Sequence, residues 1–100
     1  MASCKDHGDD CKRILGNDWN IVHCWLDEMY RYDPGNLMHR AYRHHTEGVA
    51  KVLEMWGEEA AKAAEIHIKR DFPGLDNIPT VKDWEDPDRM IKNSDQYLEL

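Results

Sequence analysis

The stretch from Leu37 to Trp56 constrains the fold more than any other part of the chain, because its apolar residues recur at steps of three and four. This spacing puts them on one face of a helix and predicts one continuous buried helix over 37–56. The predicted inward-facing residues are Met38, Ala41, Tyr42, His45, Val49, Val52, Leu53 and Trp56. Three histidines and two arginines fall in the same stretch. The helix therefore has either a solvated basic flank or a set of nitrogen donors and cations facing a pocket, and the pattern favours the pocket.

Similar apolar spacing, interrupted by glycine and proline, predicts the other elements. Three further helices are predicted, over Ser3 to about Leu15, from an Asp18 cap to about Tyr32, and over Glu58 to about Phe72. Gly57 either bends the chain or separates two helices. A turn is predicted at Asp33–Asn36, helical turns at Thr80–Trp84 and Asp88–Asn93, and a frayed tail at Tyr97–Leu100. Because nothing alternates with period two, the predicted fold is all-α, a compact bundle of about four helices plus short C-terminal helical turns.

The size and charge of the chain limit the classes of function. One hundred residues predict a single α-helical domain over 1–100. No apolar run approaches the roughly 20 residues that cross a bilayer, and the first residues lack the apolar core of a secretion signal, so we expect a cytoplasmic protein with no membrane partner. A net charge of −7 argues against general nucleic-acid binding, which depends on lysine and arginine.

Histidines and carboxylates form the candidate metal site. His67 and Asp71 are four residues apart on a predicted helix, so they share a face and can chelate an ion. His44 and His45 are adjacent and point about 100° apart, so one of them is expected to join that site. The remaining candidate ligands are His23 and His39. Mixed histidine and carboxylate donors suit zinc, iron or manganese, although a neutral hydrogen-bonded histidine in the core would give the same pattern.

Two arginines form the candidate anion site. Arg40 and Arg43 are three residues apart, so both can present donors to a phosphate or a carboxylate from one flank of a helix. The alternative is an ordinary ion pair with Glu47, Asp27 or Glu28. Near the N-terminus, Cys4-x2-His7-x3-Cys11 offers three donors, one fewer than a structural zinc site needs.

Four groups of residues follow one another along the chain in a recognisable order. They are Val22-His23-x-Trp25-x-Asp27-Glu28, His39-Arg40-x2-Arg43-His44-His45-x-Glu47-Gly48, Glu65-x-His67-x3-Asp71 and Ile78-Pro79-Thr80-x2-Asp83-Trp84. This order resembles a family of small bacterial and phage proteins catalogued as a domain of unknown function, whose members also carry histidines near the N-terminus, where this chain has His7. The resemblance implies that His23, the 39–45 block, and His67 with Asp71 belong to one pattern and converge in space.

The leading hypothesis is a histidine-rich domain that binds a transition metal and hydrolyses a phosphate-containing substrate through a metal-activated water. The alternative is a non-enzymatic phage-type protein that sequesters a small anionic ligand or blocks a host protein. A third reading is a structural helical homo-oligomer. Since no Gly-rich phosphate loop, GxSxG elbow, HExxH or CxxC motif is present, the sequence leaves open whether the protein is an enzyme.

Overall fold

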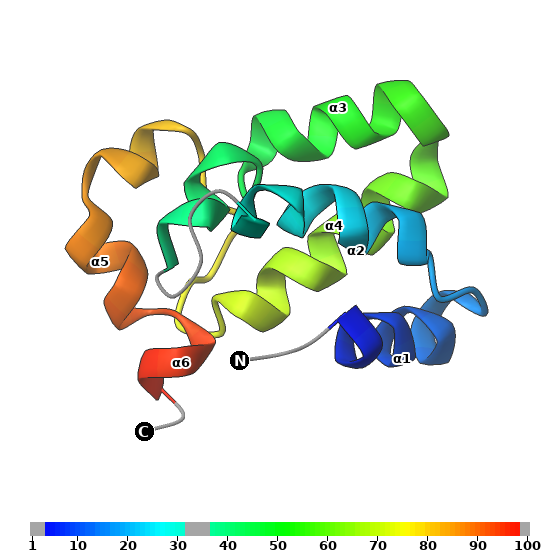
Figure 1. Cartoon of the computed structure of the whole chain (residues 1–100), viewed down its shortest axis with the longest axis horizontal. Coiled ribbons are helices and arrows are strands. Elements are labelled where there is room, and N and C mark those ends of the chain that lie inside the picture. Colours follow the sequence, from blue (N-terminus) through cyan, green and yellow to red (C-terminus); the bar gives the residue numbers. More distant parts are fainter. Residues whose placement is uncertain (1–3, 32–36, 99–100) are drawn as a thin grey trace.

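Helix α4 (Glu58–Asp71) runs through the middle of the molecule and contacts α1, α2, α3 and α6 (Figure 1). The computed structural model describes residues 4–31 and 37–98. The other α-helices are α1 (Cys4–Leu15), α2 (Asn20–Asp27), α3 (Thr46–Trp56), α5 (Pro87–Lys92) and α6 (Asp95–Leu98). The 3-10 helices are η1 (Glu28–Arg31), η2 (Leu37–Tyr42) and η3 (Lys82–Glu85). The described residues form helices and no strand, which confirms the predicted all-α bundle.

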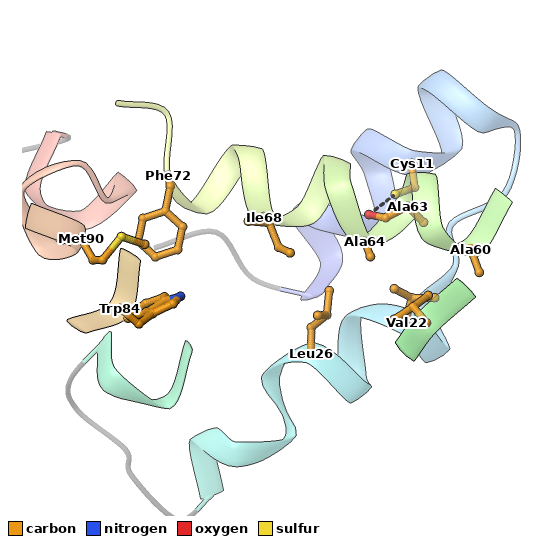
Figure 2. Close-up of a cluster of buried hydrophobic side chains, with 11 residues drawn as sticks. Cys11, Val22, Leu26, Ala60, Ala63, Ala64, Ile68, Phe72, Trp84 and Met90 are labelled. Carbon is orange, nitrogen blue, oxygen red and sulfur yellow. Dashed lines mark hydrogen bonds between the residues drawn. The ribbon is translucent and has the colours of Figure 1, made fainter. Parts of the chain in front are cut away.

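The hydrophobic core runs along α4, with Cys11 on one side of this helix and Val22 and Leu26 on the other (Figure 2). Its alanines Ala60, Ala63 and Ala64 are fully buried, and their small side chains let neighbouring helices come close. On the α1 side, the Cys11 thiol donates a weak hydrogen bond to the carbonyl oxygen of Ala63, at 3.8 Å. The other members of this core cluster are Val22, Leu26, Val52, Ile68, Phe72, Trp84 and Met90. This packing holds α4 rigidly against the helices that supply the other polar groups described below.

Most predicted helix ends are where the sequence places them. Gly16 adopts φ 82° after α1, and Gly57 adopts φ 95° between α3 and α4, so Gly57 is a break and not a bend. Positive φ values of this kind favour glycine, which lacks a Cβ atom. Thr80 and Asp83 cap one another, since each main-chain N–H donates to the other's side chain. The carboxylate of Asp86 accepts from the N–H of Arg89 at the start of α5.

The predicted continuous helix over 37–56 is wrong. The chain forms the 3-10 helix η2, leaves helical geometry at residues 43–45, and begins α3 at Thr46. His45 is the N-cap of α3, with extended backbone angles of φ −162° and ψ 175°. Its Nδ1 accepts a hydrogen bond from the N–H of Gly48 at 3.0 Å, and its Nε2 lies 3.1 Å from the carbonyl oxygen of Tyr42. A side chain that satisfies main-chain groups in this way ends one helix and starts the next.

Other expectations about the chain also need correction. Tyr42 and Leu53, predicted to face inward, are exposed because the break at His45 changes the helical register. Residues 95–98 form α6 instead of a frayed tail, although residues 99 and 100 lie outside the described chain. The turn predicted at Asp33–Asn36 also lies outside the described residues. Within the described ranges, no helix is both long enough and apolar enough to cross a membrane.

Gly48→Ala is expected to destabilise the protein, because a Cβ atom at residue 48 would overlap the carbonyl oxygen of Arg43. The clash is with the backbone, so the segment that carries His44 would have to move. We expect the free energy of unfolding in urea to fall by about 2–3 kcal/mol, the cost of overpacking a tight site. Ala50→Ser, at an exposed position of the same helix, is the control and should change it by less than about 0.5 kcal/mol. A variant as stable as the parent would mean that this close approach is absent.

Candidate metal centre

Three parts of the chain bring two imidazoles and two carboxylates together at one end of α4. His67 and Asp71 lie one turn apart on α4, Asp27 is the last residue of α2, and His44 lies in the non-helical segment before α3. The hydrogen bond from the Trp84 indole N–H to the carbonyl oxygen of His44, at 2.9 Å, helps to hold that segment in place. We call this group the four-donor cluster; its members are Asp27, His44, His67 and Asp71.

The distances between donor atoms are those of ligands around a single ion. One donor atom from each of Asp27, His44, His67 and Asp71 lies within 4.8 Å of the other three. The two Nε2 atoms are 3.2 Å apart. His44 Nε2 lies 3.0 Å from Asp71 Oδ2 and 3.3 Å from Asp27 Oδ1. For His67 Nε2 these distances are 3.2 and 3.3 Å.

These spacings match common coordination geometries. A tetrahedral ion with bonds of about 2.0–2.1 Å separates its donors by about 3.3 Å. Neighbouring donors on an octahedral ion with similar bonds are separated by about 3 Å. The five distances between a nitrogen and another donor, 3.0 to 3.3 Å, fit either arrangement.

Three side chains of the four-donor cluster are buried and the fourth is partly exposed. The side chains of His44, His67 and Asp71 are at most 1% exposed, whereas that of Asp27 is 24% exposed. Asp27 is therefore the member of the cluster with most contact with solvent. Such a combination of buried donors and one accessible edge is typical of sites that bind a ligand from solution.

Two further histidines surround His67. The His7 ring stacks on the His67 ring with a centroid distance of 3.5 Å, and His7 Nε2 lies 3.2 Å from Oδ1 of Asp71. Nδ1 of His23 lies 2.9 Å from Nδ1 of His67, on the side of the ring that faces away from the cluster. Both added histidines are fully buried. His67 is thus enclosed by aromatic rings and has one nitrogen directed at the cluster.

Arg40 supplies the buried positive charge next to the cluster. Its Nη2 lies 3.3 Å from Oδ1 of Asp71, and its Nη1 donates to Oδ1 of Asp95 on α6 at 3.0 Å. The guanidinium lies over the Phe72 ring, 5.3 Å from the centroid, and the side chain is 1% exposed. Arg40 therefore connects a donor of the cluster to the C-terminal helix.

The pKa values follow from this arrangement. Burial opposes a charge on His67, but the carboxylates of Asp27 and Asp71 outweigh it and raise the pKa of His67 to about 9. Burial likewise opposes a charge on Asp71, yet hydrogen bonds with His44 and His67 hold its pKa well below the usual range. Burial, and then the nearby His67, lower the pKa of His23 to about 4. At neutral pH and without an ion, Asp71 is thus ionised, His67 protonated and His23 neutral.

The structure brings some of the predicted ligands together and separates others. His44, His67 and Asp71 share the four-donor cluster, and His23 contacts His67 from behind. The His39 ring packs edge-on against His44, with a centroid distance of 6.3 Å. His45 instead caps α3. Of the two alternatives for residues 39 and 40, a solvated basic flank does not fit, since His39 and Arg40 are at most 2% exposed.

The two arginines of the predicted anion site lie in different surroundings. Arg40 faces the buried carboxylates of Asp71 and Asp95. Arg43 donates to the carbonyl oxygen of Trp25 at 2.7 Å, and its guanidinium lies 4.3 Å from the centroid of that indole. Binding of an external anion by both therefore stays a prediction, and it would require Arg40 to leave two carboxylates.

Sequence reasoning missed Asp27 as a donor, although a signal was present. His23 and Asp27 are four residues apart on α2, the same step that identifies His67 and Asp71 on α4. The chain thus carries two His-x3-Asp pairs, and each pair puts one carboxylate into the cluster. No comparable signal pointed to His7, because its partner Asp71 lies 64 positions later in the chain.

Comparison with known proteins identifies a family but no activity. A family model described as Domain of unknown function (DUF6915) matches residues 2–93. This match confirms the predicted relationship to a domain of unknown function. No curated protein and no solved structure matches the chain. The function therefore has to be argued from the geometry of the site.

Proposed function

This chain belongs to the DUF6915 family, and we propose that it binds one divalent transition-metal ion in the four-donor cluster. The observation that carries the proposal is the set of five distances of 3.0 to 3.3 Å between donor atoms from α2, α4 and the segment before α3. Two imidazoles and two carboxylates suit zinc, iron or manganese. Zinc would favour the tetrahedral arrangement, and iron or manganese the octahedral one.

The charge of the buried groups supports a divalent ion. Asp71 and Asp95 are both at most 3% exposed and face Arg40, which balances one of them. Asp27 adds a third carboxylate at the solvent side. A divalent ion together with Arg40 would balance all three carboxylates, so His67 would no longer need its extra proton. Buried carboxylates without such compensation are costly.

We extend the proposal to metal-assisted hydrolysis of a phosphate-containing substrate. A bound divalent ion can lower the pKa of a coordinated water towards neutrality and so supply a nucleophile. Asp27 marks the side from which water and substrate would enter, since its side chain is the most exposed of the four. In this proposal a phosphate oxygen would bind at the metal site, and neither Arg40 nor Arg43 is assigned to the substrate.

A structural ion is the second candidate, and one observation favours it. Four protein donors are enough to fill a tetrahedral coordination sphere, whereas catalytic zinc sites keep one position open. Cobalt(II) substitution separates the two functions, because its visible absorption reports coordination number. A spectrum that changes on addition of inorganic phosphate supports an open, hydrolytic centre. A tetrahedral spectrum that phosphate leaves unchanged supports a structural ion.

The first test is elemental analysis of untagged protein purified without chelator. Close to one equivalent of zinc, iron or manganese supports the proposal and justifies a screen of phosphomonoesters and phosphodiesters. Folded protein that contains no metal and gains none on dialysis against each of the three ions contradicts it. In that case the non-enzymatic binding protein becomes the better hypothesis.

The apparent affinity for zinc is expected to rise about tenfold per pH unit from pH 7 to about pH 9. The pKa of His67 is raised to about 9, so an ion that binds at neutral pH must displace one proton from this side chain. Competition with a chromophoric chelator at pH 7.0, 7.7 and 8.4 measures the slope. Calorimetry in two buffers with different protonation enthalpies should show about one proton released per ion. A flat profile would mean that His67 is neutral in the metal-free protein.

A further inference from the structure

We infer that His23, held by the main-chain carbonyl of Asp18, is a positioning residue that fixes the tautomer and direction of His67. The inference rests on the proposed metal site. Nδ1 of His23 lies 2.9 Å from Nδ1 of His67, and Nε2 of His23 lies 2.8 Å from the carbonyl oxygen of Asp18. His23 is fully buried, so water does not compete for these contacts. The three groups form one chain of hydrogen bonds that starts at the backbone.

The proton positions in this chain follow from the chemistry of its two ends. A carbonyl oxygen can only accept, so Nε2 of His23 must carry a hydrogen and donate it to Asp18. At the other end, a metal ion needs the lone pair of His67 Nε2, so the neutral ring must carry its hydrogen on Nδ1. That hydrogen is donated to Nδ1 of His23, which is left with a lone pair. Every nitrogen then has one role, and the lone pair of His67 Nε2 is directed at the four-donor cluster, where a metal ion would take the place of the proton.

The backbone next to this chain of hydrogen bonds adopts an energetically unfavourable conformation. Trp19 has φ 53° and ψ 41°, and it is the one non-glycine residue with positive φ in the described ranges. Bulky residues rarely adopt this region, and a residue held there marks a structural or functional constraint. The Trp19 carbonyl accepts from the N–H groups of Val22 and His23, while the preceding carbonyl of Asp18 is directed at the His23 side chain. The left-handed turn at Trp19 therefore supplies the acceptor for His23.

A partner that orients a ligating histidine affects how tightly the ion is held. A carbonyl or carboxylate that accepts from such a histidine fixes its tautomer and raises its basicity, and loss of the partner typically lowers metal affinity 10- to 100-fold. Here the partner of His67 is His23, whose other ring nitrogen donates a hydrogen bond to the carbonyl oxygen of Asp18. Since α2 provides both this partner and the donor Asp27, one helix controls two of the four ligands.

Two variants of nearly equal shape test the inference. His23→Asn keeps an oxygen acceptor near the position of Nδ1, whereas His23→Leu removes the acceptor. Zinc affinity, measured by chelator competition at fixed pH, is expected to fall 10- to 100-fold in His23→Leu and less than about threefold in His23→Asn. Val22→Ala removes a buried neighbour on the same helix and is the control for loss of stability. Equal losses in both His23 variants, or a loss in His23→Leu no greater than in Val22→Ala, would overturn the inference.

Nitrogen NMR of the metal-free parent separates failure of this inference from failure of the proposed function. The spectrum should show a hydrogen on Nε2 of His23 and none on its Nδ1. If the parent binds no metal but His23 has this tautomer, the proposed metal site is refuted. The hydrogen-bond chain from Asp18 through His23 to His67 is then still supported. If His23 carries its hydrogen on Nδ1, the positioning role fails whether or not metal binds.

Discussion

We expect His67→Ala to abolish the near-stoichiometric metal binding that the proposed site predicts. His67 supplies one of two imidazoles in a cluster whose other donors lie 3.2 to 3.3 Å away, and its side chain is fully buried, so water cannot simply replace it. We expect the apparent affinity for zinc, iron or manganese to fall by more than the 100-fold reached when only the partner of a ligand is lost. Elemental analysis after gel filtration, and chelator competition for the same samples, measure the effect.

His45→Ala is the matched control, because His45 is also buried but caps α3 instead of facing the cluster. It should retain close to one equivalent of metal and lose about 1 kcal/mol of stability, the usual cost of removing an N-cap. Metal should also stabilise the parent against urea, by about 2.7 kcal/mol at a free ion concentration 100 times the Kd, and leave His67→Ala unchanged. Equal metal content in parent and His67→Ala would place the ion elsewhere and refute the proposed site.

Arg40→Met lowers the free energy of unfolding of the metal-free protein by about 3–5 kcal/mol, the usual cost of removing one partner of a buried ion pair. Arg40 is the cation that faces both Asp71 and Asp95, and all three side chains are at most 3% exposed. Methionine keeps much of the volume but removes the positive charge that lies beside the two carboxylates. Urea unfolding followed by circular dichroism, on protein stripped of metal, is the measurement.

A double variant separates lost charge from lost packing. Arg40→Met combined with Asp95→Asn should recover part of the stability, because it removes one of the uncompensated carboxylates. Arg43→Met is the control at a partly exposed arginine, 22% exposed, and should cost about 1 kcal/mol through its lost hydrogen bond to Trp25. An Arg40→Met protein within 1 kcal/mol of the parent, or a double variant less stable than Arg40→Met alone, would contradict this account.

Local sequence signals predicted the helices well, because their causes are local. Glycines with positive φ end α1 and α3, and the Thr80 and Asp83 pair begins η3 as expected. The break before α3 was missed, since the apolar spacing of 37–56 continues through it. The break is held by short-range contacts, namely the close approach of Gly48 to the Arg43 carbonyl and the capping bonds of His45, and by the long-range hydrogen bond from Trp84 to the His44 carbonyl. Periodicity alone does not report such contacts.

The candidate site was predicted only in part, because only some of its contacts lie within a single helix. The i, i+4 step identified His67 and Asp71, whose proximity depends on one helix alone. Placing His44 and Asp27 beside them required knowledge of how α2 and the segment before α3 pack on α4. Arg40 shows most clearly that contacts between distant parts of the chain could not be predicted from the sequence. The sequence predicted an anion site at this arginine, or an ion pair with a nearby carboxylate, but its charge faces Asp71 and Asp95, which lies 55 positions away.

The pairing of Arg40 with Asp95 has a consequence for where the functional unit ends. The family match stops at residue 93, two positions before the carboxylate that accepts from Nη1 of Arg40. In a protein shortened to the matched region, the guanidinium would lose Asp95, and we expect it to neutralise more of the charge of Asp71. If the proposed metal site is right, α6 therefore affects metal affinity although it is short and contributes no donor.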